Sequence, residues 1–224
     1  MSVTTLVFDA YRTLFDVAGA ARAAAADTPA LAGTWAKLAE EWRRKQLEYT
    51  WQRAMTGQHA LFDQVTADAL DWAMEAQGLA DPDLRARLLA LYDRLPAFPE
   101  VPGVLAQLKS RGLRLAILSN GSPGMLTAAT AAAGIEEPFS AILSVEQTRI
   151  FKPAWQVYAL VEQHLHVPPQ QVMFVSANGW DIAGAATFGF HTTWVNRSGA
   201  PMDRLPGTPR HIIPDLSHLP RLIP

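Results

Sequence analysis

Near the start of the chain, a short apolar run that ends in a carboxylate constrains the fold more than any other feature. Leu6, Val7 and Phe8 form this run and Asp9 follows directly, which predicts a buried strand with an acid at its exit. A lone acid at a strand end is usually a turn cap. An isolated charge in an apolar interior is too costly, however, so Asp9 must face a cleft or bind donors. In an open α/β sheet, ligands bind in the cleft beyond the strand ends.

Strand and helix patterns alternate through the second half of the chain. Apolar runs predict strands at residues 113–118, 141–144, 172–175 and 192–195, and amphipathic stretches predict helices at 104–111, 123–133, 154–166 and 182–188. Short connections between them indicate right-handed βαβ units. The expected fold is therefore α/β, with a Rossmann-like, doubly wound, mostly parallel sheet. The proline-rich tail after Val195 is expected to be a surface loop.

A wholly helical region interrupts this pattern after the first strand. Helices are expected at residues 18–26, 34–55, 64–77 and 81–95, and prolines at 96, 99 and 102 then break the chain. We therefore predict an inserted helical cap subdomain at residues 17–96, over a Rossmann-like catalytic core formed by residues 1–16 and 97–224.

The helix expected at residues 34–55 is strongly amphipathic. Its apolar face carries Trp35, Leu38, Trp42 and Tyr49, and its polar face offers Glu40 to Arg44 and Glu41 to Lys45 at i,i+4 spacing. Arg43 projects from a partly apolar flank between these faces. Spacing alone favours its interpretation as a snorkelling surface cation.

The net charge and the cysteine content limit the kinds of ligand and site that this chain is expected to have. The formal net charge is −2, so nothing favours nucleic acid or an anionic membrane, and a small molecule is the expected ligand. The chain has no cysteine, which excludes disulfides, thiol nucleophiles and thiolate metal sites. It lacks a signal-peptide pattern and a long apolar span, so a cytoplasmic location is the default expectation.

Polar residues at the ends of three expected strands form the strongest functional signal. Because parallel strands end at one edge of a sheet, these residues should surround one crevice: Asp9, Ser119, Asn120, Ser176 and Asn178. Lys152 and Asp181 are expected on adjoining loops. Hydroxyl, amide and backbone donors at helix starts favour an anion, and a lysine near Asp9 would keep that carboxylate ionised.

Five segments carry a family resemblance. They read D-A-Y-x-T-L-F-D from Asp9, W-R-R-K-Q-L-E-Y-T-W from Trp42, L-S-N-G-S from Leu118, K-P at Lys152 and F-V-S-A-N-G-W-D from Phe174. The chain thereby resembles the L-2-haloacid dehalogenases of the haloacid dehalogenase superfamily. The resemblance implies hydrolysis of (S)-2-haloalkanoic acids to (R)-2-hydroxyalkanoic acids without a metal or other cofactor, and often a homodimer.

The resemblance also implies roles for individual residues. Asp9 would be the nucleophile, and Arg43 with Asn120 would receive the departing halide. Ser119 and backbone amides near Tyr11 would hold the substrate carboxylate. Residues that would orient Asp9 and guide a water, with Asp181 as the base, are Thr13, Lys152, Tyr158, Ser176, Asn178 and Asp181. The pocket would be walled by Tyr11, Leu47, Phe62 and Trp180.

Two alternatives remain open. A magnesium-dependent phosphatase of the same superfamily would need a second acid two residues after Asp9, where this chain has Tyr11, and carboxylates in place of Ser176 and Asn178. A catalytically impaired carboxylate binder is the other alternative, because Arg12 stands where the family usually has glycine. Arg12 could pair with Asp9, help to bind the substrate carboxylate or point to solvent, and a positive φ there would add strain.

Overall fold

The sheet confirms the expected α/β class. The structure, a computed structural model, describes residues 3–223, so residues 1, 2 and 224 of the predicted core lie outside it. Six strands lie in the order β3-β2-β1-β4-β5-β6, and every neighbouring pair is parallel. Their bounds are β1 Thr5–Phe8, β2 Arg114–Ser119, β3 Phe139–Ser144, β4 Val172–Ser176, β5 His191–Val195 and β6 His211–Ile213.

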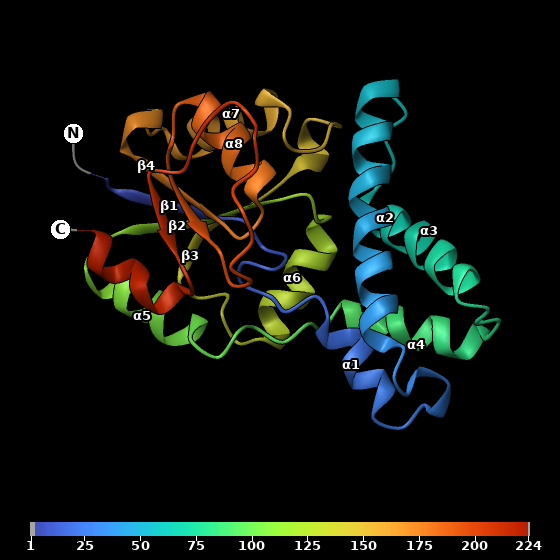
Figure 1. Ribbon diagram of the computed structural model, residues 1–224. Helices are drawn as coiled ribbons and strands as arrows, with labels where there is room; N and C mark the ends of the chain where they lie inside the picture. The colour runs from blue at the N-terminus through green and yellow to red at the C-terminus, as the bar shows by residue number, and fades with distance from the viewer. Residues whose placement is uncertain (1–2, 224) are drawn as a thin grey trace.

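Helices cover both faces of this sheet. On one side lie α5 (Val101–Ser110) and α6 (Pro123–Ala132), and on the other lie α7 (Trp155–Leu165) and α8 (Gly179–Phe188) (Figure 1). The chain runs from β1 outward to β2 and β3 and then returns to β4 on the other side of β1. The order therefore reverses at β1, and the crevice expected at such a reversal lies at the ends of β1, β2 and β4.

Four of the five α-helices between β1 and β2 gather beside the sheet. They are α1 (Gly19–Ala25), α2 (Trp35–Thr56), α3 (Phe62–Ala76) and α4 (Pro82–Tyr92), with a short 3-10 turn at Pro29–Leu31, and they pack against one another at one side of the molecule (Figure 1). Asp81 caps α4 as expected, accepting a hydrogen bond from the Leu84 backbone N–H at 2.9 Å. The division into a cap at 17–96 and a core around it stays a prediction. Within residues 3–223, no helix combines the length and apolarity that crossing a bilayer requires.

Three contacts hold this helical group against the sheet. His59 Nε2 lies 2.7 Å from Glu146 Oε2, and the Phe62 backbone N–H donates to Glu146 Oε1 at 3.2 Å. The Trp51 ring on α2 meets the Trp180 ring on α8 edge to face at 5.6 Å. Together they fix α2 and the start of α3 beside the strand ends.

Two helices begin three residues earlier than the sequence predicts. Helix α5 starts at Val101 with Pro102 in its first turn, because a proline there loses no helical hydrogen bond. Helix α8 starts at Gly179, so Asp181 lies in its first turn and not on a loop. That turn gives Asp181 a fixed direction toward the strand ends.

The C-terminal tail is not merely a loop. Residues His211–Ile213 form β6, which extends the sheet beyond β5, and Leu216–Leu222 form a 3-10 helix. Ile213 and Leu216 are buried. The prolines that suggested a loop interrupt these elements without preventing a short edge strand.

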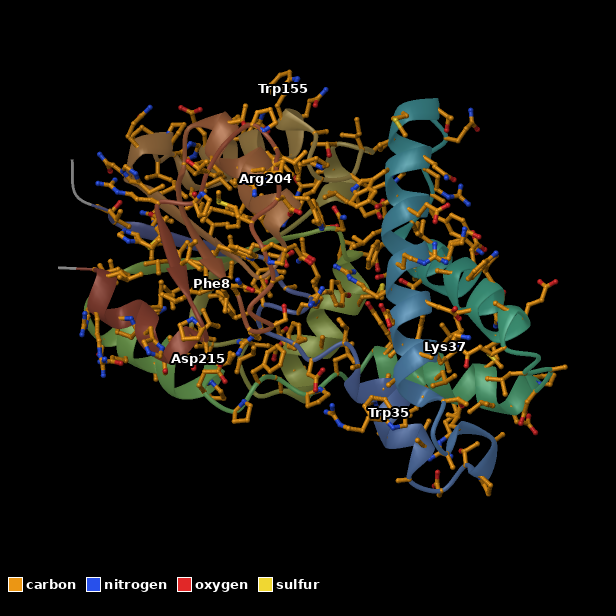
Figure 2. The ribbon with its side chains drawn as sticks, in the orientation of Figure 1. Phe8, Trp35, Lys37, Trp155, Arg204 and Asp215 are labelled. Atoms are coloured by element: carbon orange, nitrogen blue, oxygen red, sulfur yellow. The ribbon has the colours of Figure 1, made fainter. Side chains whose placement is uncertain are left out.

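Helix α2 has the predicted apolar face but different ion pairs. Leu38 and Trp42 are buried, whereas Trp35, at the N-terminal end of α2 in Figure 2, is only partly buried. The expected pairs Glu40–Arg44 and Glu41–Lys45 are wrong. Arg44 and Lys45 instead lie 3.1 and 3.0 Å from Glu48, because a single carboxylate one turn further along serves both cations.

Candidate active site

Asp9 is held by three side-chain donors at the end of β1. Thr13 Oγ1 and Asn178 Nδ2 each donate to Asp9 Oδ2 at 2.9 Å, and Lys152 Nζ donates to Oδ1 at 3.1 Å. Asp9 is 5% exposed. Thr13 is itself fixed by the Ala177 backbone N–H at 2.8 Å. The carboxylate is therefore held in one orientation at the crevice, as the strand-end pattern predicts.

Lys152 bridges two buried carboxylates. Its Nζ also lies 2.9 Å from Asp181 Oδ2, and the lysine is 1% exposed. Burial is the main cause that raises the pKa of Asp181, to about 6, and the charge of Asp9 adds to it while Lys152 opposes it. Asp181 is thus a buried acid that gains and loses its proton close to neutral pH.

Tyr158 acts on Asp181 and does not contact Asp9. Its hydroxyl donates to Asp181 Oδ1 at 2.8 Å, and burial raises the pKa of Tyr158 well above the ordinary value. Gly184 allows this position, because a Cβ at Gly184 would meet the Tyr158 hydroxyl oxygen at 2.6 Å. The expectation that Tyr158 orients Asp9 therefore becomes an indirect role through Asp181.

The remaining strand-end residues surround Asp9 without touching it. Asn120 Oδ1 accepts from the Lys152 backbone N–H at 3.0 Å, and Asn120 Nδ2 has no partner in the described part of the chain, so its donors are available to a ligand. Ser119 Oγ and Ser176 Oγ each accept a backbone N–H at 3.1 Å, from Gly121 and Asn178. Both hydroxyls keep their own hydrogen to donate.

Arg43, on α2, lies near Tyr11 and Tyr92, whose pKa values are raised by burial, lowered by its charge and raised by the charge of Asp9. It is partly buried, donates from Nη1 to Gln46 Oε1 at 2.7 Å, and leaves a buried Nε without a partner. No carboxylate within residues 3–223 forms an ion pair with it. The interpretation of Arg43 as a surface cation is wrong, because part of its guanidinium is turned inward and uncompensated.

A polar network that the sequence analysis missed fixes Arg43. Gln46 is 1% exposed, and its Nε2 donates to Thr66 Oγ1 at 2.7 Å and lies 3.2 Å from the Tyr92 hydroxyl. Burial raises the pKa of Tyr92. The i,i+3 spacing between Arg43 and Gln46 was a usable signal, whereas nothing in the sequence points to Tyr92.

Two of the four predicted wall residues, Tyr11 and Phe62, lie together, and Leu47 lies with Arg43 instead. The Tyr11 ring lies 5.5 Å from Phe62 and 5.6 Å from Tyr92, and Leu47 lines a cavity of about 570 Å³ with Arg43. Trp180 differs, because it lines another cavity, of about 480 Å³, beyond its contact with Trp51. Its role as a wall of the Asp9 site stays a prediction.

Arg12 does not pair with Asp9. It has φ +68°, a left-handed conformation that favours glycine, and its side chain forms no ion pair among the residues described. Desolvation and then the charge of Arg43 lower the pKa of Arg12, while Asp9 raises it. Other donors occupy the Asp9 oxygens, so of the three alternatives for Arg12 the pair with Asp9 is not formed, and Arg12 lines the cavity of Arg43 and Leu47.

These residues do not fit a magnesium site. Among residues 3–223 no group of three or more His, Cys, Asp or Glu side chains is arranged to hold a metal ion. The ammonium group of Lys152 lies between Asp9 and Asp181, where a divalent cation would need to meet both carboxylates.

Known proteins are similar to this chain in sequence and in fold. A sequence model of haloacid dehalogenase-like hydrolases matches residues 3–189. (S)-2-haloacid dehalogenase 1 of Pseudomonas sp. (strain CBS-3) is 42% identical over 222 residues, covering 99% of this chain and 96% of that protein. A dehalogenase solved with an intermediate complex has a TM-score of 0.95 and 38% identity, covering 99% of this chain and 97% of that one. The L-2-haloacid dehalogenase of Xanthobacter autotrophicus, solved with chloropropionic acid covalently bound, has a TM-score of 0.89 and 39% identity, covering 98% of each chain.

Proposed function

The chain belongs to the haloacid dehalogenase-like hydrolases, and from this premise we propose that it hydrolyses (S)-2-haloalkanoic acids to (R)-2-hydroxyalkanoic acids. One observation carries the proposal: three donors fix Asp9, and Arg43, whose charge and that of Asp9 both act on Tyr11, pairs with no carboxylate among residues 3–223. Displacement of a halide needs a carboxylate nucleophile and a cation that stabilises the departing halide. The covalently bound chloropropionic acid of the Xanthobacter relative supports a step through an enzyme-bound ester.

In the first step, one oxygen of Asp9 attacks C2 of the substrate from the side opposite the halogen. A C–O ester bond forms as the carbon–halogen bond breaks, the halide leaves with the bonding electrons, and the configuration at C2 inverts. Arg43 and the free Nδ2 of Asn120 stabilise the halide, whose charge appears only as the bond breaks. Ser119 and backbone amides near Tyr11 hold the substrate carboxylate.

In the second step, water attacks the carbonyl carbon of the Asp9 ester. Asp181 takes one proton from that water as the water oxygen bonds to the carbonyl carbon. The C–O bond between that carbon and the Asp9 oxygen that attacked C2 then breaks, the departing alkoxide takes up the second proton of the water to become the hydroxyacid, and the Asp9 carboxylate is restored while Asp181 passes its proton to solvent. Lys152, Thr13 and Asn178 keep the carbonyl in place. Tyr158 and Ser176 act indirectly, by positioning Asp181 and the Asn178 backbone.

Halide release from the two enantiomers of 2-chloropropionate tests the function. We expect chloride from the (S) enantiomer only, with (R)-lactate as product and no loss of rate in EDTA. Ion chromatography measures the chloride that is released, and chiral chromatography identifies the enantiomer of lactate. Halide release that depends on added magnesium, or phosphatase activity toward p-nitrophenyl phosphate without dehalogenation, would contradict the proposal.

Ester hydrolysis should slow in acid because Asp181 must be ionised to accept a proton. Its pKa is about 6 in the free protein, and esterification removes the Asp9 charge that helps to raise it, so the midpoint should lie at or below 6. Below it, the rate of ester decay should fall about tenfold per pH unit. Quenched mass spectrometry should therefore find more ester-linked protein at pH 5 than at pH 8. Equal amounts would argue against Asp181 as the base.

Gln46→Met should lower kcat by roughly 10-fold to 100-fold, because Arg43 loses the acceptor that holds it. KM should change little. The loss should be greater for a chloro substrate than for a bromo substrate, since chloride leaves less readily. Gln52→Met on the exposed side of the same helix is the matched control. An equal loss for both halogens would mean that Gln46 supports the fold alone.

Three further properties complete the proposal. The enzyme works without a metal or other cofactor, since Lys152 supplies the positive charge between the carboxylates. It acts as a homodimer and in the cytoplasm.

A further inference from the structure

The cavity that Arg12 lines, three residues after Asp9, contains more positive charge than the reaction uses. It has a volume of about 570 Å³, and its lining includes Arg12, Arg43, Arg44 and one acid, Glu40. Arg44 is engaged elsewhere, since it lies 3.1 Å from Glu48 and over the Trp72 ring. Arg43 serves the halide in the proposed reaction. Arg12 is therefore the remaining arginine of this cavity, and the proposed reaction assigns it no function.

Arg12 contributes no polar side-chain contact to the fold within the described residues, whereas its backbone N–H donates to the Phe15 carbonyl at 2.8 Å. Its φ of +68° is strained for any residue except glycine. Within residues 3–223, its side chain forms neither an ion pair nor a side-chain hydrogen bond. The residue is exposed, and the guanidinium lines the same cavity as Arg43. A long cation at a position suited to glycine thus remains free to meet an anion.

The rest of the cavity suits a short aliphatic chain. Trp35, Ala39 and Leu47 give it an apolar wall, and Figure 2 places Trp35 at the N-terminal end of α2. Arg43 and Leu47 line this cavity and are also predicted substrate contacts, and Arg12 follows Asp9 by three residues, which places the cavity next to the predicted substrate site. A substrate that has its C2 at Asp9 could extend methylene groups along this wall.

We propose that this cavity is a subsite for the second carboxylate of halogenated dicarboxylic acids, with Arg12 as the residue that selects them. The proposal rests on the dehalogenase function and names a substrate class for it. Ser119 and the backbone amides near Tyr11 hold the carboxylate next to C2. The distal carboxylate, carried by one to three methylenes, pairs with the Arg12 guanidinium. Glu40 opposes this binding but is outnumbered by the arginines.

Matched substrate pairs test the subsite. We compare kcat/KM for (S)-2-bromoglutarate with that for (S)-2-bromopentanoate, which has the same carbon chain and one carboxylate fewer. The ratio of diacid to monoacid should fall at least tenfold in Arg12→Gln and Arg12→Gly, and should stay within about threefold of the unmodified protein in Arg12→Lys. The exposed Arg204→Gln removes the same charge elsewhere and should leave the ratio unchanged. The diacid rate should also fall more steeply with added salt.

A ratio that is the same in Arg12→Gln and in the unmodified protein would overturn the subsite. So would Arg12→Gly raising monoacid turnover with the ratio unchanged, because the side chain would then only obstruct the site. Binding of glutarate and of pentanoate by calorimetry separates the two proposals. If no haloacid is turned over, the proposed dehalogenase function is wrong. Preferential binding of glutarate that is lost in Arg12→Gln would still support the subsite in that case. Equal binding of glutarate and pentanoate would reject the subsite.

Discussion

Asp9→Asn should reduce halide release from (S)-2-chloropropionate by on the order of 10⁴-fold or more, because an amide cannot form the ester intermediate. The substitution also places an NH₂ group where the carboxylate accepts from Thr13, Asn178 and Lys152. Lys152 still pairs with Asp181, so the fold should survive. Asp27→Asn is the matched control, since Asp27 is an exposed partner of Arg87.

A single turnover in H₂¹⁸O distinguishes this nucleophile from a general base. If water attacks the Asp9 ester, the first cycle leaves ¹⁸O in the Asp9 carboxylate, and the hydroxyacid receives the unlabelled Asp9 oxygen. Mass spectrometry of the peptide that contains Asp9 should then show a gain of about 2 Da. Label found in the hydroxyacid alone would falsify the covalent mechanism, whatever the loss of activity in Asp9→Asn.

The strand ends of the site were predictable because sheet geometry is a strong constraint. Asp9 lies more than a hundred residues before both Ser119 and Asn178 in the sequence. Parallel strands that end at one edge of a sheet nevertheless bring the three residues together. The same reasoning could not give the direction of Asp181, because the sequence pattern delayed the start of α8. The helix begins three residues before its predicted start, so Asp181 lies in its first turn and not on a loop.

The contributions of the helical group were harder to predict. Helical spacing alone made Arg43 a surface residue, and only its packing near Tyr11 and Gln46 shows it turned inward. Spacing describes one helix, whereas the side that a helix buries depends on its neighbours. Arg12 is a second example. The sequence indicates that its φ could be positive, but where its side chain lies depends on which donors already occupy the oxygens of Asp9.

Lys152→Met should remove activity by at least about 10³-fold and lower the free energy of unfolding by about 3–5 kcal/mol. The substitution leaves Asp9 and Asp181 buried with no cation between them. Two neighbouring carboxylates cannot both stay ionised there. One of them takes up a proton at neutral pH, and each outcome is harmful: a protonated Asp9 cannot attack C2, and a protonated Asp181 cannot activate water.

A double variant shows whether charge balance is the cause. In Lys152→Met/Asp181→Asn only Asp9 is left to ionise, so part of the lost stability should return, whereas dehalogenation should stay low because the base is absent. Urea unfolding at pH 7 measures the stability, and chloride release measures the activity. The single variant should regain stability as the pH falls toward 5, because the proton that its folded state takes up costs less free energy at lower pH. If Lys152→Met is as stable as the unmodified protein at pH 7, the lysine does not balance the two carboxylates, and the electrostatic basis of the proposed site is wrong.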